Sequence, residues 1–228
     1  MDALVAWALN YALAGPVATA LGAVPSGSTH GWAAHGALRL AAVFLLVVWL
    51  KLVRGVDVTD LKALFPATRR LIGVGAVVGL AFFAVEYLTV VAIQLIDRQP
   101  NLVDGTWNPW VATRSLTEPT IVFLLVFAVV GPLVEEFVHR GVAYPALRSR
   151  LPKIMAAVLS STVFALGHDW TAFDLVGAFA LGLIAIWLVE RYKSLTPAIA
   201  AHMASNLSVV VVGWSLYHLF GVPGTFVG

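Results

Sequence analysis

The sequence predicts an all-α membrane protein, a polytopic bundle of seven or eight transmembrane helices around an intramembrane cavity. Of its 228 residues, 60% are hydrophobic and 11% charged, whereas roughly a quarter of the residues in an ordinary soluble domain are charged. The mean hydropathy is +0.90. The apolar residues also occur in blocks close to the length of about 20 residues that a helix needs to cross a bilayer. Helices are the expected spanning elements because each satisfies its own backbone hydrogen bonds.

Seven apolar segments are expected to be the membrane helices. The first lacks the basic residues of a cleaved signal and is interpreted as a retained helix. In the third, Gly75 and Gly79 have the spacing of small residues that let two helices pack closely. The fourth contains Gly131 and Pro132, which could break it and give an eighth helix. In order, the segments are about 3–23, 32–53, 71–96, 118–147, 153–168, 173–190 and 195–221.

The chain is interpreted as a single transmembrane domain, 1–228, without an internal repeat. Residues 1–117 would supply N-terminal helices and a long external loop, and 118–221 would form the core that carries the chemistry. With no cysteine, the chain has no disulfide, thiolate metal site or cysteine nucleophile. A net charge of +2 indicates no nucleic-acid partner. The oligomeric state is left open, and the lipid bilayer is the expected surrounding.

Loop charges predict the orientation in the membrane. Cations cluster in three of the connections between segments, and by the positive-inside rule these connections are cytoplasmic. Alternation along the chain then places the N-terminus in the cytoplasm, in a membrane of the bacterial inner type. The cations are Lys51, Arg54, Lys62, Arg69 and Arg70, then Arg148, Arg150 and Lys153, and finally Arg191 and Lys193.

Four polar residues on three of the late segments lie at a similar depth. Counted from the cationic ends at about 1.5 Å per residue, they are roughly 14 to 22 Å into the membrane. Ionisable groups at such depth are costly and usually face a partner or an aqueous cavity. The four are Glu135, His168, His202 and Asn206.

The spacing of neighbouring residues suggests how this group is supported. Glu136 and Arg140 are four residues apart, in the favourable order for an ion pair on one helix face. Glu135 is turned about 100° away from Glu136 and can face a different neighbour. His139, four residues after Glu135, is expected either to lie behind the site within reach of Glu135 or to face the cytoplasm.

Other polar residues have less definite expected positions. Glu86 lies at nearly the depth of the proposed site, where it could be a partner for Arg140, a proton relay or a substrate contact. His30, His35 and His218 are assigned to loops or to the membrane interface.

Three short motifs occur in order on successive late segments: "EEFVHR" from Glu135, "FALGH" from Phe164 and "HMASN" from His202. Together they resemble the CPBP family of intramembrane proteases, which includes the CAAX prenyl endopeptidases of the Rce type and the bacterial Abi-like membrane proteins. The resemblance covers roughly residues 131–206. Each motif alone is a weak signal, whereas three in order in an all-helical membrane protein are a strong one.

The resemblance implies an endopeptidase that hydrolyses a peptide or a membrane-protein tail. Glu135 would be the general base for a water molecule, and His168 would help to hold or deprotonate that water. His202 and Asn206 would donate hydrogen bonds to the oxyanion. Glu136, Arg140 and Phe164 would hold the catalytic helices in place.

Three alternatives remain at this point. Zinc is one, with Glu135, His168 and His202 as ligands, although "HExxH" is absent and Asn206 would be a poor fourth ligand. The metal-free mechanism, which requires no cofactor, is preferred. The second alternative is a non-catalytic scaffold or immunity-type protein on the same fold. The third is a transporter with Glu86 and Glu135 as a proton relay, for which no paired inverted repeats are visible.

Overall fold

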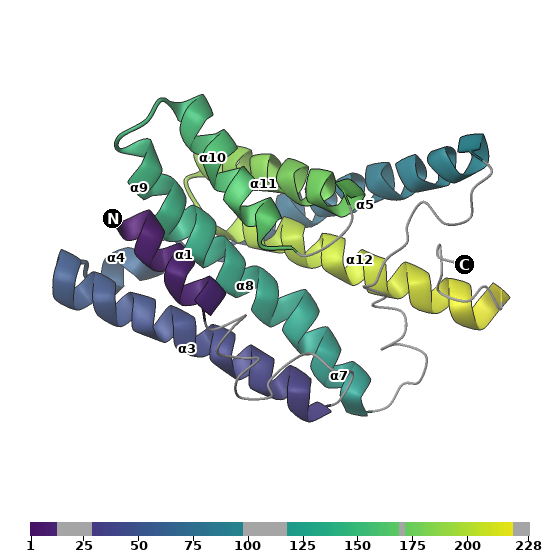
Figure 1. Ribbon diagram of the computed structural model, residues 1–228, viewed down its shortest axis with the longest axis horizontal. Coiled ribbons are helices and arrows are strands. Elements are labelled where there is room, and N and C mark those ends of the chain that lie inside the picture. The colour runs from purple at the N-terminus through teal and green to yellow at the C-terminus, as the bar shows by residue number, and fades with distance from the viewer. Residues whose placement is uncertain (13–28, 98–117, 169–171, 221–228) are drawn as a thin grey trace.

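The computed structural model describes residues 1–12, 29–97, 118–168 and 172–220, and these residues form helices with no β-strand among them (Figure 1). The predicted all-α fold is confirmed. The first half contains α1 (Asp2–Ala12), α3 (Thr29–Arg54), α4 (Val58–Ala63) and α5 (Arg69–Asp97). The second half contains α7 (Glu118–Leu125), η2 (Val126–Val130), α8 (Gly131–Glu136), η3 (Phe137–Ala143), α9 (Tyr144–Arg148), α10 (Lys153–Leu166), α11 (Ala172–Tyr192) and α12 (Thr196–Phe220).

Four helical stretches in the described part are long and apolar enough to cross a membrane, which makes the chain an integral membrane protein. Six of the seven expected segments coincide with helices, the described half of the first lies in α1, and the short α4 is an additional helix. The second half of segment 3–23 and the predicted external loop lie outside the described residues. The four stretches are Thr29–Arg54, Arg69–Thr89, Ile121–Arg148 and Leu175–Tyr192, and two shorter apolar helices are Lys153–Leu166 and Thr196–Val212.

The fourth segment is one continuous helical rod, so the expected break at Gly131 and Pro132 is wrong. The rod changes its winding instead: η2 and η3 are π-helical, and the α-helical turn between them carries the paired glutamates. Pro132 has no backbone N–H, so it cannot donate to a carbonyl of the preceding turn. The chain widens into a π-helical turn just before it, a feature that is frequent at functional sites.

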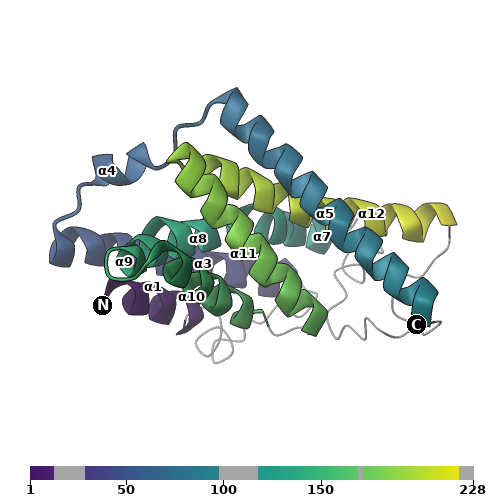
Figure 2. The ribbon, with the colours of Figure 1, turned by 90° about the horizontal axis from the view of Figure 1, so that it is seen from above.

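The rod lies at the centre of the fold. α1 packs against η3, α3 packs against α7 and η2, and α12 contacts both η2 and α8. α5 packs against α12 rather than against the rod, and it crosses α12 obliquely in Figure 2. An added Cβ at Gly79 would overlap the backbone carbonyl of Ala201, and one at Gly75 that of Pro197. The close packing expected from these two glycines is therefore confirmed.

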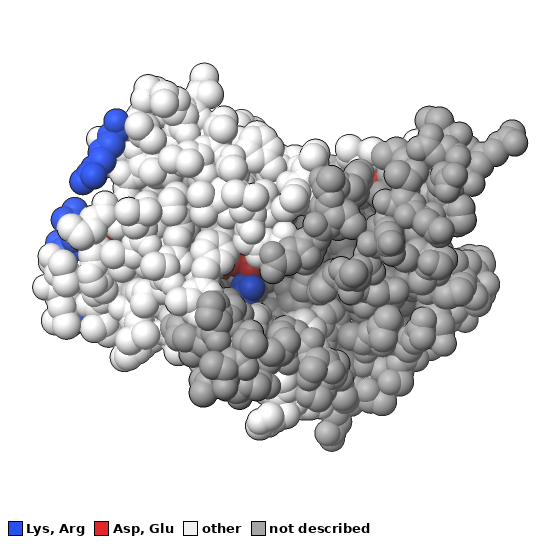
Figure 3. Space-filling view, in the orientation of Figure 1, with Lys and Arg blue, Asp and Glu red and all other residues white. Residues whose placement is uncertain are grey.

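Cationic side chains gather at one end of the bundle, which is the left end in Figure 3. Here Glu190 of α11 accepts a hydrogen bond from the Tyr144 hydroxyl (2.8 Å) and pairs with Lys193 (3.2 Å) and Lys153 (3.5 Å). The N-terminus lies at the same end in Figure 1. The side of the membrane that this end faces stays a prediction of the positive-inside rule.

Candidate active site

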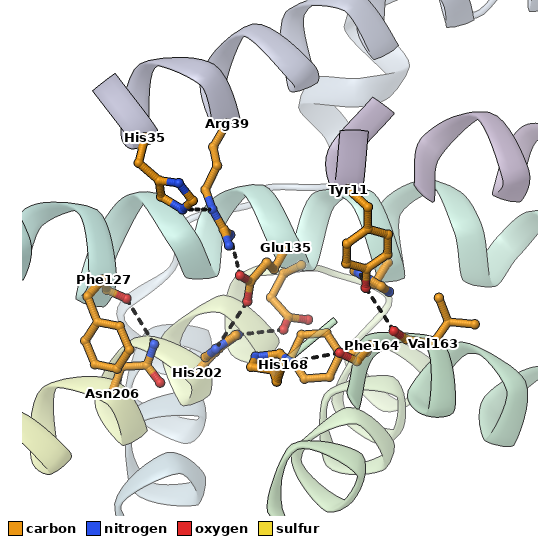
Figure 4. A network of polar contacts seen from close by, with 12 residues as sticks. Tyr11, His35, Arg39, Phe127, Glu135, Val163, Phe164, His168, His202 and Asn206 are labelled. Atoms are coloured by element: carbon orange, nitrogen blue, oxygen red, sulfur yellow. Dashed lines mark hydrogen bonds and ion pairs between the residues drawn. The ribbon is translucent and has the colours of Figure 1, made fainter. Parts of the chain in front are cut away.

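A cavity of about 320 Å³ opens between the rod and the surrounding helices α3, α5, α10, α11 and α12. Glu135 lines it from α8, His168 from the end of α10, and His202 and Asn206 from α12. Figure 4 shows these four side chains around one space. The structure thus brings together the four residues that were selected for their shared depth.

The two carboxylate oxygens of Glu135 have different neighbours. Its Oε1 atom forms an ion pair and hydrogen bond with Nη1 of Arg39, which comes from α3. Its Oε2 atom lies 3.7 Å from Nε2 of His202. The Glu135 side chain is 13% exposed. Oε1 of Glu135 is therefore engaged by Arg39, whereas Oε2 faces His202 at the cavity.

Glu136 supports the site from behind. Its fully buried carboxylate accepts a hydrogen bond from Nη1 of Arg140 at 2.9 Å, so the predicted ion pair is confirmed. The same oxygen lies 3.0 Å from Nδ1 of His202. Because this carboxylate can only accept, His202 carries a proton on Nδ1 and presents Nε2 to Glu135. Glu136 thus sets the orientation of a ring that lines the cavity.

Phe164 packs between the histidines. Its ring centroid lies 4.8 Å from that of His168, 5.2 Å from His139 and 5.8 Å from His202. The guanidinium of Arg140 lies 4.3 Å from the same centroid, over the ring. Phe164 is 1% exposed. One aromatic ring therefore fixes the relative positions of the residues of all three motifs.

His168 and Asn206 are each anchored by a backbone carbonyl. Nδ1 of His168 donates to the carbonyl of Phe164 at 2.8 Å, which leaves Nε2 as the acceptor nitrogen of the ring. Nδ2 of Asn206 donates to the carbonyl of Phe127 at 3.0 Å. In the π-helical turn the donor for that carbonyl would be residue 132, which is a proline without an N–H. Asn206 thus donates to a backbone carbonyl of the π-helical turn that precedes Pro132.

Arg39 and His35 are the site residues that the sequence reasoning missed. His35, which was assigned to a loop or the interface, is a buried residue of α3 and accepts a hydrogen bond from Nε of Arg39 at 3.0 Å. That assignment is wrong. An arginine within the apolar segment 32–53 was the available signal, since an intramembrane cation usually has a functional partner.

The structure also places the two residues that had uncertain positions. His139 is 1% exposed, and its ring nitrogens contact Trp7 and Tyr11 of α1, each at 3.3 Å. A cytoplasm-facing position is therefore wrong for His139. Glu86 lines the cavity from α5. Its carboxylate lies against Gly177, where an added Cβ would overlap it.

Zinc was considered with Glu135, His168 and His202 as ligands, and the metal-free site stays a prediction. Within the described ranges, no three His, Cys, Asp or Glu side chains are grouped as metal ligands. Glu135 pairs with a guanidinium, and the Nδ1 atoms of His168 and His202 donate hydrogen bonds, as the second ring nitrogen of a metal-bound histidine also does. The site is built around hydrogen bonds and ion pairs among its own side chains.

Comparisons with known proteins point to one family. Residues 117–208 match the family described as "Type II CAAX prenyl endopeptidase Rce1-like". The chain is also 29% identical over 101 residues to "Putative membrane peptidase YdiL" of Bacillus subtilis (strain 168), which covers 44% of this chain and 41% of that relative. The chain thus aligns with less than half of that relative's length. No solved structure matches it.

Proposed function

With the resemblance to CAAX-type membrane proteases confirmed over residues 117–208, we propose that the chain is an intramembrane endopeptidase that hydrolyses a peptide bond in a peptide or a membrane-protein tail. One observation carries this proposal. A carboxylate, two histidines and an asparagine line one cavity inside a bundle of apolar helices. The cavity would admit an extended peptide while limiting the access of other water molecules.

Glu135 is proposed to be the general base. Its Oε2 atom removes a proton from a water molecule as the water oxygen attacks the carbonyl carbon of the substrate, which gives a tetrahedral intermediate. When the C–N bond breaks, the carboxylic acid returns the proton to the leaving amine. The products are a new carboxylate and a new amine, and Glu135 is regenerated as a carboxylate.

His168 is proposed to position the attacking water. Its Nδ1 proton is committed to the Phe164 carbonyl, so Nε2 is the ring atom that accepts a hydrogen bond from water. A water held by both His168 and Glu135 would have its lone pair directed at the substrate. Correct positioning of a nucleophile contributes substantially to a rate enhancement.

Asn206 and His202 are proposed to stabilise the oxyanion. The amide nitrogen of Asn206 carries two hydrogens, of which the Phe127 carbonyl takes one, and the second can reach a ligand in the cavity. His202 offers Nε2, which faces the same cavity, once that nitrogen is protonated. Loss of one oxyanion donor typically lowers kcat by about 10² to 10³.

The proposal is tested by cleavage of a peptide library with detergent-purified protein. We expect the wild type to cleave, Glu135→Gln to be inactive and Asn206→Ala to lose about 10² to 10³ in kcat. Asp60→Asn, on the short helix α4, is the matched control and should behave as wild type. Because the proposed chemistry needs no metal, cleavage should persist with a strong chelator.

Other outcomes would distinguish the alternatives. An active Glu135→Gln variant would contradict the role of Glu135. Loss of wild-type activity with the chelator would favour a metalloprotease. If neither protein cleaves and both bind the same peptides, the chain is a non-catalytic scaffold.

A further inference from the structure

The contact between Arg39 and Glu135 joins α3 to α8. Arg39 lies outside residues 117–208, the part that matches the protease family. Its side chain is 19% exposed and that of Glu135 is 13% exposed. Attraction between charges is much stronger at a site largely shielded from water than in water itself. This contact therefore differs from a surface ion pair, such as that of Arg54 with Asp2, in which the arginine side chain is 52% exposed.

Arg39 is itself held in a defined orientation. Its Nε atom donates to Nε2 of His35, one helical turn earlier, while its Nη1 atom reaches Glu135. The His35 ring meets the ring of Trp32 edge-on, with the centroids 6.2 Å apart. The Trp32 ring in turn packs against that of Phe123, with the centroids 4.8 Å apart. Two nitrogens of the Arg39 guanidinium, Nε and Nη1, are thus held by hydrogen bonds.

The helix that carries Arg39 lies close to the rod at Gly36, which has no side chain. An added Cβ at Gly36 would lie 2.8 Å from a methyl group of Val126 in η2, which is too close for real atoms. Either the Val126 side chain or α3 would then have to shift. The reach of Arg39 to Glu135 thus depends on the packing of α3 against the π-helical turn.

The arrangement divides the two oxygens of Glu135 between different tasks. Oε1 is engaged by Arg39, whereas Oε2 faces His202 and the cavity. We propose that Arg39 is a positioning residue that fixes the Glu135 carboxylate and presents Oε2, and not Oε1, to the attacking water. His35 acts through Arg39. The inference rests on the proposed protease function, and it assigns to α3 a part of the site that the family match does not include.

The test compares the kinetics of variants on a peptide that the wild type cleaves. We expect Arg39→Gln to lower kcat at least tenfold and to change KM less than threefold, because the base is misoriented while the cavity is retained. Arg39→Lys keeps the cation and should recover part of the loss. Arg54→Gln, on the same helix but far from the cavity lining, should keep wild-type kinetics.

A second variant keeps the test decisive if Arg39→Gln does not fold. His35→Phe retains a ring against Trp32 but removes the acceptor for Arg39, and it should lower kcat in the same direction by a smaller factor. The inference is overturned if both variants keep kcat within twofold of wild type. It is also overturned if they raise KM alone, which would make Arg39 a substrate-binding residue.

The outcome for Glu135 separates this inference from the proposed function. If Glu135→Gln is inactive and Arg39→Gln is fully active, only the role of Arg39 is wrong. If Glu135→Gln is as active as wild type, the proposed function itself is wrong.

Discussion

At the scale of single residues, the geometry of the proposed site depends on groups to which no part in the reaction itself is assigned. Phe164 contacts three histidine rings and one guanidinium, and Glu136 binds both Arg140 and His202. These contacts give a reason for the phenylalanine and the second glutamate that the motifs contain beside the proposed base, histidines and asparagine. We therefore expect a substitution of Phe164 to change the cleavage rate and a substitution of Arg140 to change the free energy of unfolding.

Replacement of Phe164 tests the role of its ring. We expect Phe164→Leu to lower kcat about tenfold, which corresponds to about 1.4 kcal/mol, because the histidines and Arg140 lose a rigid common surface. Cleavage kinetics measure this, with Phe44→Leu as the control, since Phe44 is 66% exposed on α3. A Phe164→Leu enzyme within twofold of wild type would contradict the supporting role.

Removal of Arg140 tests the buried ion pair. We expect Arg140→Gln to reduce the free energy of unfolding by about 3 to 5 kcal/mol, because it leaves Glu136 buried without its cation. Arg54→Gln breaks an exposed pair and should cost at most about 1 kcal/mol. Reversible unfolding in mixed micelles compares the two. The double variant Glu136→Gln with Arg140→Gln should regain part of the loss. If Arg140→Gln and Arg54→Gln lower the free energy of unfolding equally, the account is refuted.

The sequence predicted most of the polar site and missed the residues that α3 supplies, Arg39 and His35. Glu135, His168, His202 and Asn206 belong to motifs and share a depth, so they could be selected from the sequence. Arg39 belongs to no motif and lies about 100 positions earlier in the chain. Only the packing of α3 against the rod shows that Arg39 reaches Glu135.

At the scale of elements, the helix positions were predictable and the winding of the rod was not. The seven apolar segments indicated the helices because length and hydropathy are local properties of the chain. Asn206 of α12 donates to the Phe127 carbonyl inside η2, a contact between distant parts of the chain that no local sequence pattern predicts. A proline in the sequence therefore suggested a break where the fold has a continuous rod.

The packing of α5 on α12 gives a test at this scale. We expect Gly79→Leu to lower the free energy of unfolding by about 1 to 3 kcal/mol or more, because the side chain would overlap the backbone of Ala201. Gly73→Leu, on the same helix, is the matched control, since a Cβ there meets no described atom within 4 Å. Unfolding curves of the two variants check this. Similar stability of both would show that α5 does not depend on this close approach.

At the scale of the whole molecule, the cationic end of the bundle predicts how the protein lies in its membrane. The chain contains no cysteine, so single cysteines can be introduced without removing others. We expect Lys62→Cys to react with a membrane-impermeant thiol reagent only from the cytoplasmic side. Asn101→Cys, in the loop that the sequence predicts to be external, should react only from the opposite side. The reverse pattern in intact and opened cells would overturn the predicted orientation.

The central claim for the whole molecule is that Glu135 drives peptide hydrolysis inside the membrane. The most direct measurement is the initial rate of cleavage of one membrane-anchored reporter tail by wild type and Glu135→Gln, each in proteoliposomes at equal protein density. We predict that the variant is slower by at least about 10² to 10⁴, the range of general-base catalysis, while retaining wild-type stability. A stable Glu135→Gln protein that cleaves within tenfold of the wild-type rate would contradict the claim.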